Sequence, residues 1–398
     1  MSQNTQEPRD YDVVLGGHNI IPATGVVLGG IAGVKRRFAS AIAEHRVAAV
    51  KEAKKYGKAG LEIGIKALQD ESELVQKTAY LQLRERKEEE VRQALRQFNY
   101  YRFFECLRTV KAGEQIALNS TGEKAAFLAS NRTIKVVDLN AMELLYAIPK
   151  YPRNQQYFII SDDGEVLVRS IKAAKSFVEI WVGGELEHTL YGHQGEIRAI
   201  ALSPDAKFLA TGGDDRCIKI WDISSGKLIL NISPLLMWGT HKESIIRLAF
   251  SPDGKTLVSS DVSRSIKLWN WQNRSEPQTL NMVGYSLAIS PDGQMLATGC
   301  FKGIITILTL DGKIVQTLNP DSHLLHYLFR CIAFSPDGKT IVVGDGYQKS
   351  IDFWNIKTGK LIRSFTGEDI SPDCLAFSWD GQSLIAGSND KTIKIWGI

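Results

Sequence analysis

The chain has 398 residues, of which 44% are hydrophobic and 23% are charged, a composition typical of a globular protein with a large core. Its net charge of +4 is too small to indicate nucleic-acid binding, for which a basic patch across a domain would be expected. We find neither a secretory signal at the polar start of the sequence nor an apolar run long enough to span a membrane. The five cysteines form no CxxC pair, so we interpret them as reduced thiols of a cytoplasmic protein.

Residues 1–40 form a glycine-rich segment in which Val-Val-Leu-Gly-Gly occurs twice, at 13–17 and 26–30. The second copy leads into Lys35-Arg36-Arg37 and suggests a phosphate-binding loop. A Walker loop needs a longer spacing than that between Gly29 and Gly33, and it needs Ser or Thr where Arg36 stands. We therefore interpret this segment as a lead-in to the first helix and expect no cofactor.

Between residues 41 and 99 the apolar residues recur with the period of a helix. This pattern predicts four amphipathic helices, over 45–57, 58–68, 73–83 and 88–98. Asp70 and Glu73 are predicted to cap the third. The stretch from 67 to 83, with an Asp after one helix and Val75 in the next, resembles a HEAT-type helical repeat.

From residue 100 onward the sequence repeats with a period of about 40–45 residues, as expected for the four-stranded blades of a propeller. Each unit contains a turn related to Ser-Pro-Asp-Gly; these turns start at 119, 161, 203, 251, 290, 335 and 378. Alternating apolar strands surround every turn, with Pro and Gly supplying its geometry. The repeats predict seven blades.

The third unit, with Gly192-His193 and "LATGGDDRCIKIWD" at 209–222, resembles the WD-repeat family of β-propellers. The resemblance implies a structural tetrad of His193, Thr211, Asp215 and Trp221, hydrogen-bonded within the blade. We interpret the His–Asp pair as structural and not catalytic. The fourth unit keeps Trp269 but has Ser263 where the acid is expected.

The sequence ends just after Trp396, in the third strand of the seventh unit. Residues 106–114 are similar to 361–368, the fourth strand of the sixth unit. We therefore expect residues 103–110 to complete the last blade, which removes an open sheet edge. The predicted fold is a mainly β, seven-bladed WD-type propeller over 100–398, preceded by a small all-α HEAT-like module over 41–99. This arrangement is similar to cyanobacterial multidomain WD-repeat proteins.

Candidate partner-binding residues lie in two long loops between units and at the starts of first strands. The loops place apolar and aromatic side chains where polar residues are usual, and Arg and Trp are favoured at interface hot spots. The set is Leu236, Met237, Trp238, His323, Tyr327, Arg198, Arg247 and Arg330. Alternatively, the loops cover the degenerate fifth unit.

The sequence favours a non-catalytic scaffold or adaptor that holds a partner protein, without a metal. His323 and His326 with Asp321 have a metal-like spacing, but no third His or Cys accompanies them. Two alternatives stay open. One is an enzyme, either a hydrolase or lyase using the propeller channel or a handler of chromophores through HEAT-type helices. The other is a nucleic-acid-binding regulator.

Overall fold

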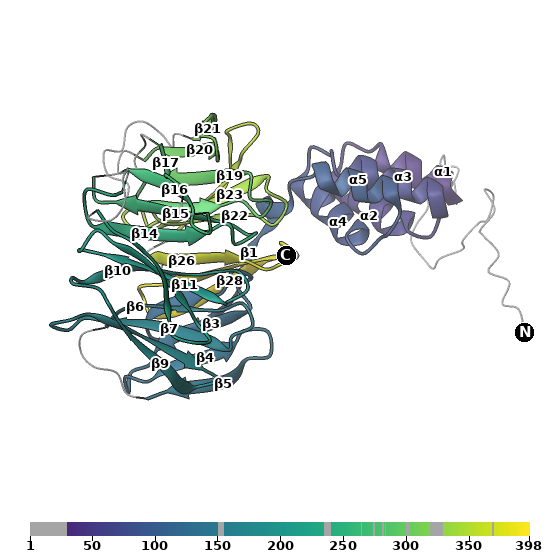
Figure 1. Ribbon diagram of the computed structural model, residues 1–398. Coiled ribbons are helices and arrows are strands. Elements are labelled where there is room, and N and C mark those ends of the chain that lie inside the picture. The colour runs from purple at the N-terminus through teal and green to yellow at the C-terminus, as the bar shows by residue number, and fades with distance from the viewer. Residues whose placement is uncertain are drawn as a thin grey trace, which may run out of the picture. The chain divides into compact units, whose positions relative to one another are not determined.

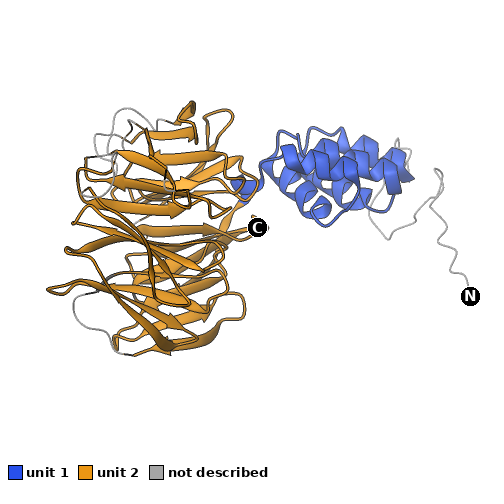
Figure 2. Cartoon of the chain, in the orientation of Figure 1, with its two compact units in different colours: residues 1–103 blue, residues 104–398 orange. Residues whose placement is uncertain are grey.

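The computed structural model describes residues 30–149, 155–234, 240–263, 265–273, 275–280, 282, 284–299, 303–318, 329–367 and 370–398. The chain divides into two compact units, Met1–Phe103 and Phe104–Ile398 (Figure 2). The first unit is helical and the second consists of strands, as the change of hydrophobic period near residue 100 predicts.

The helical unit contains the four predicted helices and one more. Its elements are α1 (Gly30–Phe38), α2 (Ala43–Ala53), α3 (Gly57–Ala67), α4 (Glu73–Leu83), α5 (Glu89–Gln97) and the 3₁₀ turn η1 (Tyr100–Phe103). The interpretation of residues up to 40 as a lead-in without a helix is wrong from Gly30 onward. Val34 of α1 is buried against Ala49 and Ile63, so the packing of the small residues on α1 stabilises a helix that a glycine-rich sequence disfavours.

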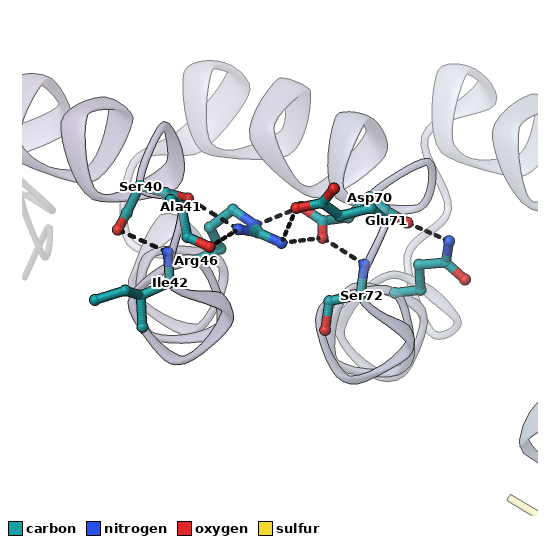
Figure 3. A network of polar contacts seen from close by, with 8 residues as sticks. Ser40, Ala41, Ile42, Arg46, Asp70, Glu71 and Ser72 are labelled. Carbon is teal, nitrogen blue, oxygen red and sulfur yellow. Dashed lines mark hydrogen bonds and ion pairs between the residues drawn. The ribbon is translucent and has the colours of Figure 1, made fainter.

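A buried ion pair holds the helical unit together (Figure 3). Arg46 of α2 donates from Nε and Nη2 to the carboxylate of Asp70, both at 2.9 Å, and from Nη1 to the carbonyls of Ser40 and Ala41. Asp70 also accepts the backbone N–H of Ser72, at the start of α4. The predicted cap by Asp70 and Glu73 therefore differs in detail: Ser72 is the N-cap residue and its side chain makes no capping bond, Glu73 is the first residue of α4, and Asp70 binds both the N–H of Ser72 and Arg46 of α2.

The second unit is a seven-bladed β-propeller, confirming the predicted fold class. Its seven four-stranded antiparallel sheets are blades one to seven in chain order (Figure 1). The first three are β2 (Glu114–Leu118), β3 (Lys124–Leu128), β4 (Ile134–Asp138) and β5 (Glu143–Ile148); β6 (Gln155–Ile160), β7 (Val166–Ile171), β8 (Phe177–Val182) and β9 (Glu185–Tyr191); β10 (Ile197–Leu202), β11 (Phe208–Gly213), β12 (Ile218–Asp222) and β13 (Leu228–Ile232).

Blades four to seven repeat this order. They are β14 (Ile245–Phe250), β15 (Thr256–Asp261), β16 (Ile266–Asn270) and β17 (Gln278–Leu280); β18 (Ser286–Ile289), β19 (Met295–Gly299), β20 (Ile305–Thr309) and β21 (Ile314–Leu318); β22 (Phe329–Phe334), β23 (Thr340–Asp345), β24 (Ser350–Asn355) and β25 (Leu361–Thr366); β26 (Pro372–Phe377), β27 (Ser383–Ser388) and β28 (Thr392–Gly397) with β1 (Glu105–Lys111).

The seventh blade takes its fourth strand from the beginning of the propeller sequence. β1 pairs antiparallel with β28 from Glu105↔Gly397 to Lys111↔Thr392 (Figure 1). The bounds of β1 lie close to the expected 103–110. Pairing the two ends of the propeller leaves the first and seventh blades in contact and closes the ring.

The Ser-Pro-Asp-Gly turns join the first and second strands of the blades by a repeated set of hydrogen bonds. In blade four, Ser251 Oγ donates to Asp253 Oδ1 at 2.5 Å and accepts the N–H of Thr256 at 2.9 Å. Gly254 has φ +70°, which only glycine adopts without strain. All first strands therefore run in the same direction, each entering at one mouth of the channel and ending in a turn at the other.

Candidate interaction surface at the channel mouth

Three buried side chains of blade three and the partly buried Asp215 form one chain of hydrogen bonds. The indole N–H of Trp221 donates to Thr211 Oγ1 at 3.0 Å, and Thr211 Oγ1 lies 2.8 Å from His193 Nε2. His193 Nδ1 lies 2.9 Å from Asp215 Oδ2, and Asp215 also accepts the N–H of Gln194. Each buried polar group thereby has a partner, which is the condition for placing it in a core.

Blade four contains an equivalent network that the sequence analysis missed. Trp269 donates to Ser259 Oγ at 2.7 Å, Ser259 Oγ lies 2.6 Å from His241 Nε2, and His241 Nδ1 lies 2.8 Å from Asp261 Oδ2. The acid comes two residues earlier than expected, at Asp261 instead of position 263. Ser263 supports it by donating to Asp261 Oδ1. The signal in the sequence was His241, since a buried imidazole needs a partner.

The order Ser259–His241–Asp261 is that of a catalytic triad, but its environment is that of a core. Ser259 is fully buried, and His241 and Asp261 are each 1% exposed, so no substrate reaches the hydroxyl. Burial lowers the pKa of His241 and keeps the imidazole neutral. Burial alone would raise the pKa of Asp261, but hydrogen bonds from His241 and Ser263 bring it below its usual value. The network therefore holds neighbouring strands together.

The three arginines predicted at the channel mouth are on the first strands of blades three, four and six. Arg198 of β10 donates from Nε to Asp214 Oδ1 at 2.5 Å, within its own blade. That hydrogen bond lowers the pKa of Asp214. Arg330 of β22 donates to Asp373 of β26, in the next blade. Two of the three guanidinium groups are thus paired with carboxylates.

Arg247 of β14 differs from the other two. Its Nη1 donates to the carbonyl of its own neighbour Ile246, at 2.8 Å, and within the described ranges no carboxylate lies within ion-pair distance of it. The surrounding channel wall lowers its pKa, whereas nearby Tyr157 and Cys331 raise it. Arginine stays protonated under such shifts. Arg247 is also exposed to solvent, so it is an accessible cation.

The strand register places Arg247 at a position where blades three, six and seven have small side chains and where blades one and two have Ile116 and Tyr157. It pairs with Ser260, whereas the corresponding residues Ala199, Cys331 and Cys374 each pair with a glycine. A large cationic side chain at this position is a departure from the repeat. The other predicted partner-binding residues lie outside the described residues: Leu236, Met237, Trp238, His323 and Tyr327. The same holds for His326 and Asp321, which were considered as metal ligands.

The described residues contain no group of three or more His, Cys, Asp or Glu side chains placed to hold a metal ion. Within the same ranges, no helix combines the length and hydropathy of a membrane-crossing segment.

The seven sheets, with tetrads in blades three and four, define the class of the second unit as a WD-type β-propeller. The family model "WD domain, G-beta repeat" matches residues 184–222, 232–270, 280–307, 312–355 and 359–397. The chain therefore belongs to the WD-repeat family. Each match runs from the fourth strand of one blade toward the third strand of the next. Blade one and the first three strands of blade two come before the first matched residue.

The curated relatives share modest identity with this chain. It is 24% identical over 257 residues to periodic tryptophan protein 2 of Saccharomyces cerevisiae, covering 53% of this chain and 27% of that protein. It is 25% identical over 289 residues to telomerase protein component 1 of Rattus norvegicus, covering 71% of this chain and 9% of that protein. Small ribosomal subunit protein RACK1 of Drosophila melanogaster is 26% identical over 267 residues, or 54% of this chain and 82% of that protein. The chain thus spans about a quarter or less of the first two relatives.

Proposed function

We propose that this protein is a non-catalytic scaffold that binds an acidic segment of a partner protein at the mouth lined by Arg198, Arg247 and Arg330, which we term the arginine mouth. The observation that carries the proposal is the guanidinium of Arg247, which has no carboxylate partner in the described wall. An exposed guanidinium without a carboxylate partner attracts a carboxylate that arrives at the mouth.

The charges of the arginine mouth support an acidic ligand. Three arginines face two carboxylates, Asp214 and Asp373, which leaves one positive charge. Because the paired arginines are held by their carboxylates, Arg247 is the group available for a bidentate bond to a carboxylate. From the sequence alone, we also propose that two loops supply apolar contacts to the partner; they contain Leu236, Met237, Trp238, His323 and Tyr327.

The relatives support a role in assembly. The name of one designates a protein of the small ribosomal subunit, and that of another a component of telomerase. A WD-type ring offers a rigid surface for such assembly, and the free cysteines of the described residues fit a cytoplasmic location. The cyanobacterial resemblance stays a prediction.

Affinity capture from the source organism tests the proposal. The full chain, Arg247→Glu and Arg108→Glu serve as baits, and co-purifying proteins are quantified by mass spectrometry. Arg108 is exposed on β1, the outermost strand of blade seven, so its variant makes the same charge change away from the channel. We expect a partner that the wild type and Arg108→Glu retain and Arg247→Glu loses. Identical sets of bound proteins on all three baits would contradict the proposal.

A further inference from the structure

The opposite mouth of the channel, where the first strands end, contains a cavity of about 630 Å³. It is lined by apolar residues from the ends of the first strands, such as Leu202, Phe250 and Phe334, and by the turns that follow them. The second residue of every one of the seven turns is in its lining: Ser120, Asp162, Pro204, Pro252, Pro291, Pro336 and Trp379. The lip is therefore apolar through blades three to seven and polar in blades one and two.

Trp379 is the departure from the repeat at this mouth. Four turns have proline at its position, which sets the backbone angle of the turn, whereas blade seven has an indole that is 71% exposed. Nothing in the turn requires tryptophan, because the turn bonds are made by Ser378, which donates to Asp380 Oδ1 at 2.6 Å, and by the N–H of Gln382. An exposed tryptophan at the lip of an apolar cavity is typical of a binding hot spot.

A second, smaller cavity of about 180 Å³ lies beside Trp379, between blades seven and one. Trp379 and Thr121 line both cavities. Glu123 and Asp380 line the small one, and Asp162 adds a third carboxylate at the adjoining lip of the large one. The nearby cation Lys124 is already paired with Asp138. This side of the mouth is acidic as well as aromatic.

The geometry points to a second binding site at this mouth, which takes a basic segment of a partner protein. A lysine or arginine of the segment lies against the indole of Trp379 with its charge between Glu123 and Asp380, and an adjacent apolar side chain enters the large cavity. An aromatic face attracts a cation, and the two carboxylates complement its charge. An acidic segment would be repelled by these carboxylates, and a wholly apolar segment would bring no cation to them.

Selection from a displayed library of random twelve-residue peptides tests this inference. The targets are the full wild-type chain, Trp379→Pro and Arg247→Glu. Trp379→Pro removes the indole while supplying the residue that four other turns contain, so it is expected to fold. We expect peptides with a basic residue next to an apolar one to be enriched on the wild type and on Arg247→Glu, and not on Trp379→Pro.

A synthetic peptide from that selection is then titrated by fluorescence anisotropy. We expect Trp379→Pro to weaken binding about 30-fold, as for an interface hot spot, and Glu123→Gln with Asp380→Asn to weaken it about tenfold and to flatten its salt dependence. Enrichment that persists on Trp379→Pro, or a wild-type selection without preference for basic residues, would overturn the site. Because Arg247→Glu leaves this mouth intact, failure here is distinguishable from failure of the proposed arginine mouth.

Discussion

The two mouths of the propeller channel are built by the same seven first strands yet carry opposite chemistry. The mouth where the strands begin presents arginines, of which Arg247 lacks a carboxylate partner in the described wall. The mouth where they end presents proline turns, an exposed Trp379 and carboxylates on one side. Five residues of a strand span about 17 Å, so the two mouths are separate surfaces.

In this repeat protein, the residues that distinguish the two mouths lie at positions that depart from the repeat. The ring is fixed by residues that recur, namely the Ser–Asp turns and the apolar strands. Arg247 is a cation at a register position where other blades have uncharged residues such as Tyr157, Ala199 and Cys331, and Trp379 occupies a position at which four blades have proline. Substitutions at such positions alter surface chemistry without changing the fold. Both mouths keep their separate chemistry only if they belong to one rigid ring, so the stability of the ring is what must be measured.

Removing β1 has the largest expected effect. A chain starting at residue 112 lacks the fourth strand of blade seven and leaves β28 as an open edge. We expect it to lose cooperative thermal unfolding, measured by circular dichroism, and to aggregate in size-exclusion chromatography. The control is a chain starting at Phe104, which keeps β1 and the whole second compact unit. Cooperative unfolding of the 112–398 chain at the temperature of this control would break the account of closure.

Interrupting either tetrad has the next largest effect. Thr211→Val and Ser259→Ala each leave a buried indole N–H and imidazole without their shared partner. We expect a loss of about 1–3 kcal/mol in the free energy of unfolding, measured by denaturant titration. Thr109→Val, at an exposed position of β1, should change it by less than about 0.5 kcal/mol. Equal effects at all three sites would mean that the networks do not stiffen the ring.

The tetrad of blade four makes stability depend on pH. Because burial lowers the pKa of His241 in the folded state, the unfolded chain takes up a proton first as pH falls below about 6.5. The stabilisation by His241 is therefore present at neutral pH and lost on acidification. We expect the difference in unfolding free energy between wild type and His241→Asn to be smaller at pH 5.5 than at pH 7.5. A difference that grows on acidification would contradict a neutral His241.

The ion pair between Arg330 and Asp373 has the smallest expected effect on the ring. Both side chains are about one-third exposed, so water and salt screen their attraction. We expect Arg330→Gln to lower the free energy of unfolding by only about 0.2–1 kcal/mol, with a smaller change at high salt. A loss comparable to that in the tetrad variants would show that this arginine holds blades six and seven together and is not a surface group of the mouth.

The fold was predictable because its information is local and repeated. Seven related turns at regular spacing predict seven blades, and the change of period near residue 100 predicts the helical unit. Helix α1 was missed because its stability comes from burying Val34 and small residues, which propensity does not register. Asp261 was missed because the position of the acid was inferred from one blade, whereas the distance to His241 decides which carboxylate pairs.

The arginine mouth was predictable only as a set of positions. Their place at the starts of first strands identified Arg198, Arg247 and Arg330 as candidates. Which of them form ion pairs depends on Asp214, which lies in a turn, and on Asp373, which lies in another blade. Trp379 was not predicted as a binding residue. Its replacement of proline indicates a binding site only once the structure shows that all seven turns line one cavity.

The central claim is that Arg247 binds a carboxylate of a partner, and the dissociation constant of the captured partner tests it most directly. The measurement compares wild type, Arg247→Gln and Arg108→Gln by titration at low and high salt. We predict that Arg247→Gln weakens binding about 30-fold or more and reduces its salt dependence, while Arg108→Gln binds as the wild type does. Binding by Arg247→Gln within about twofold of the wild type, a change below that of any hot-spot residue, would contradict the account.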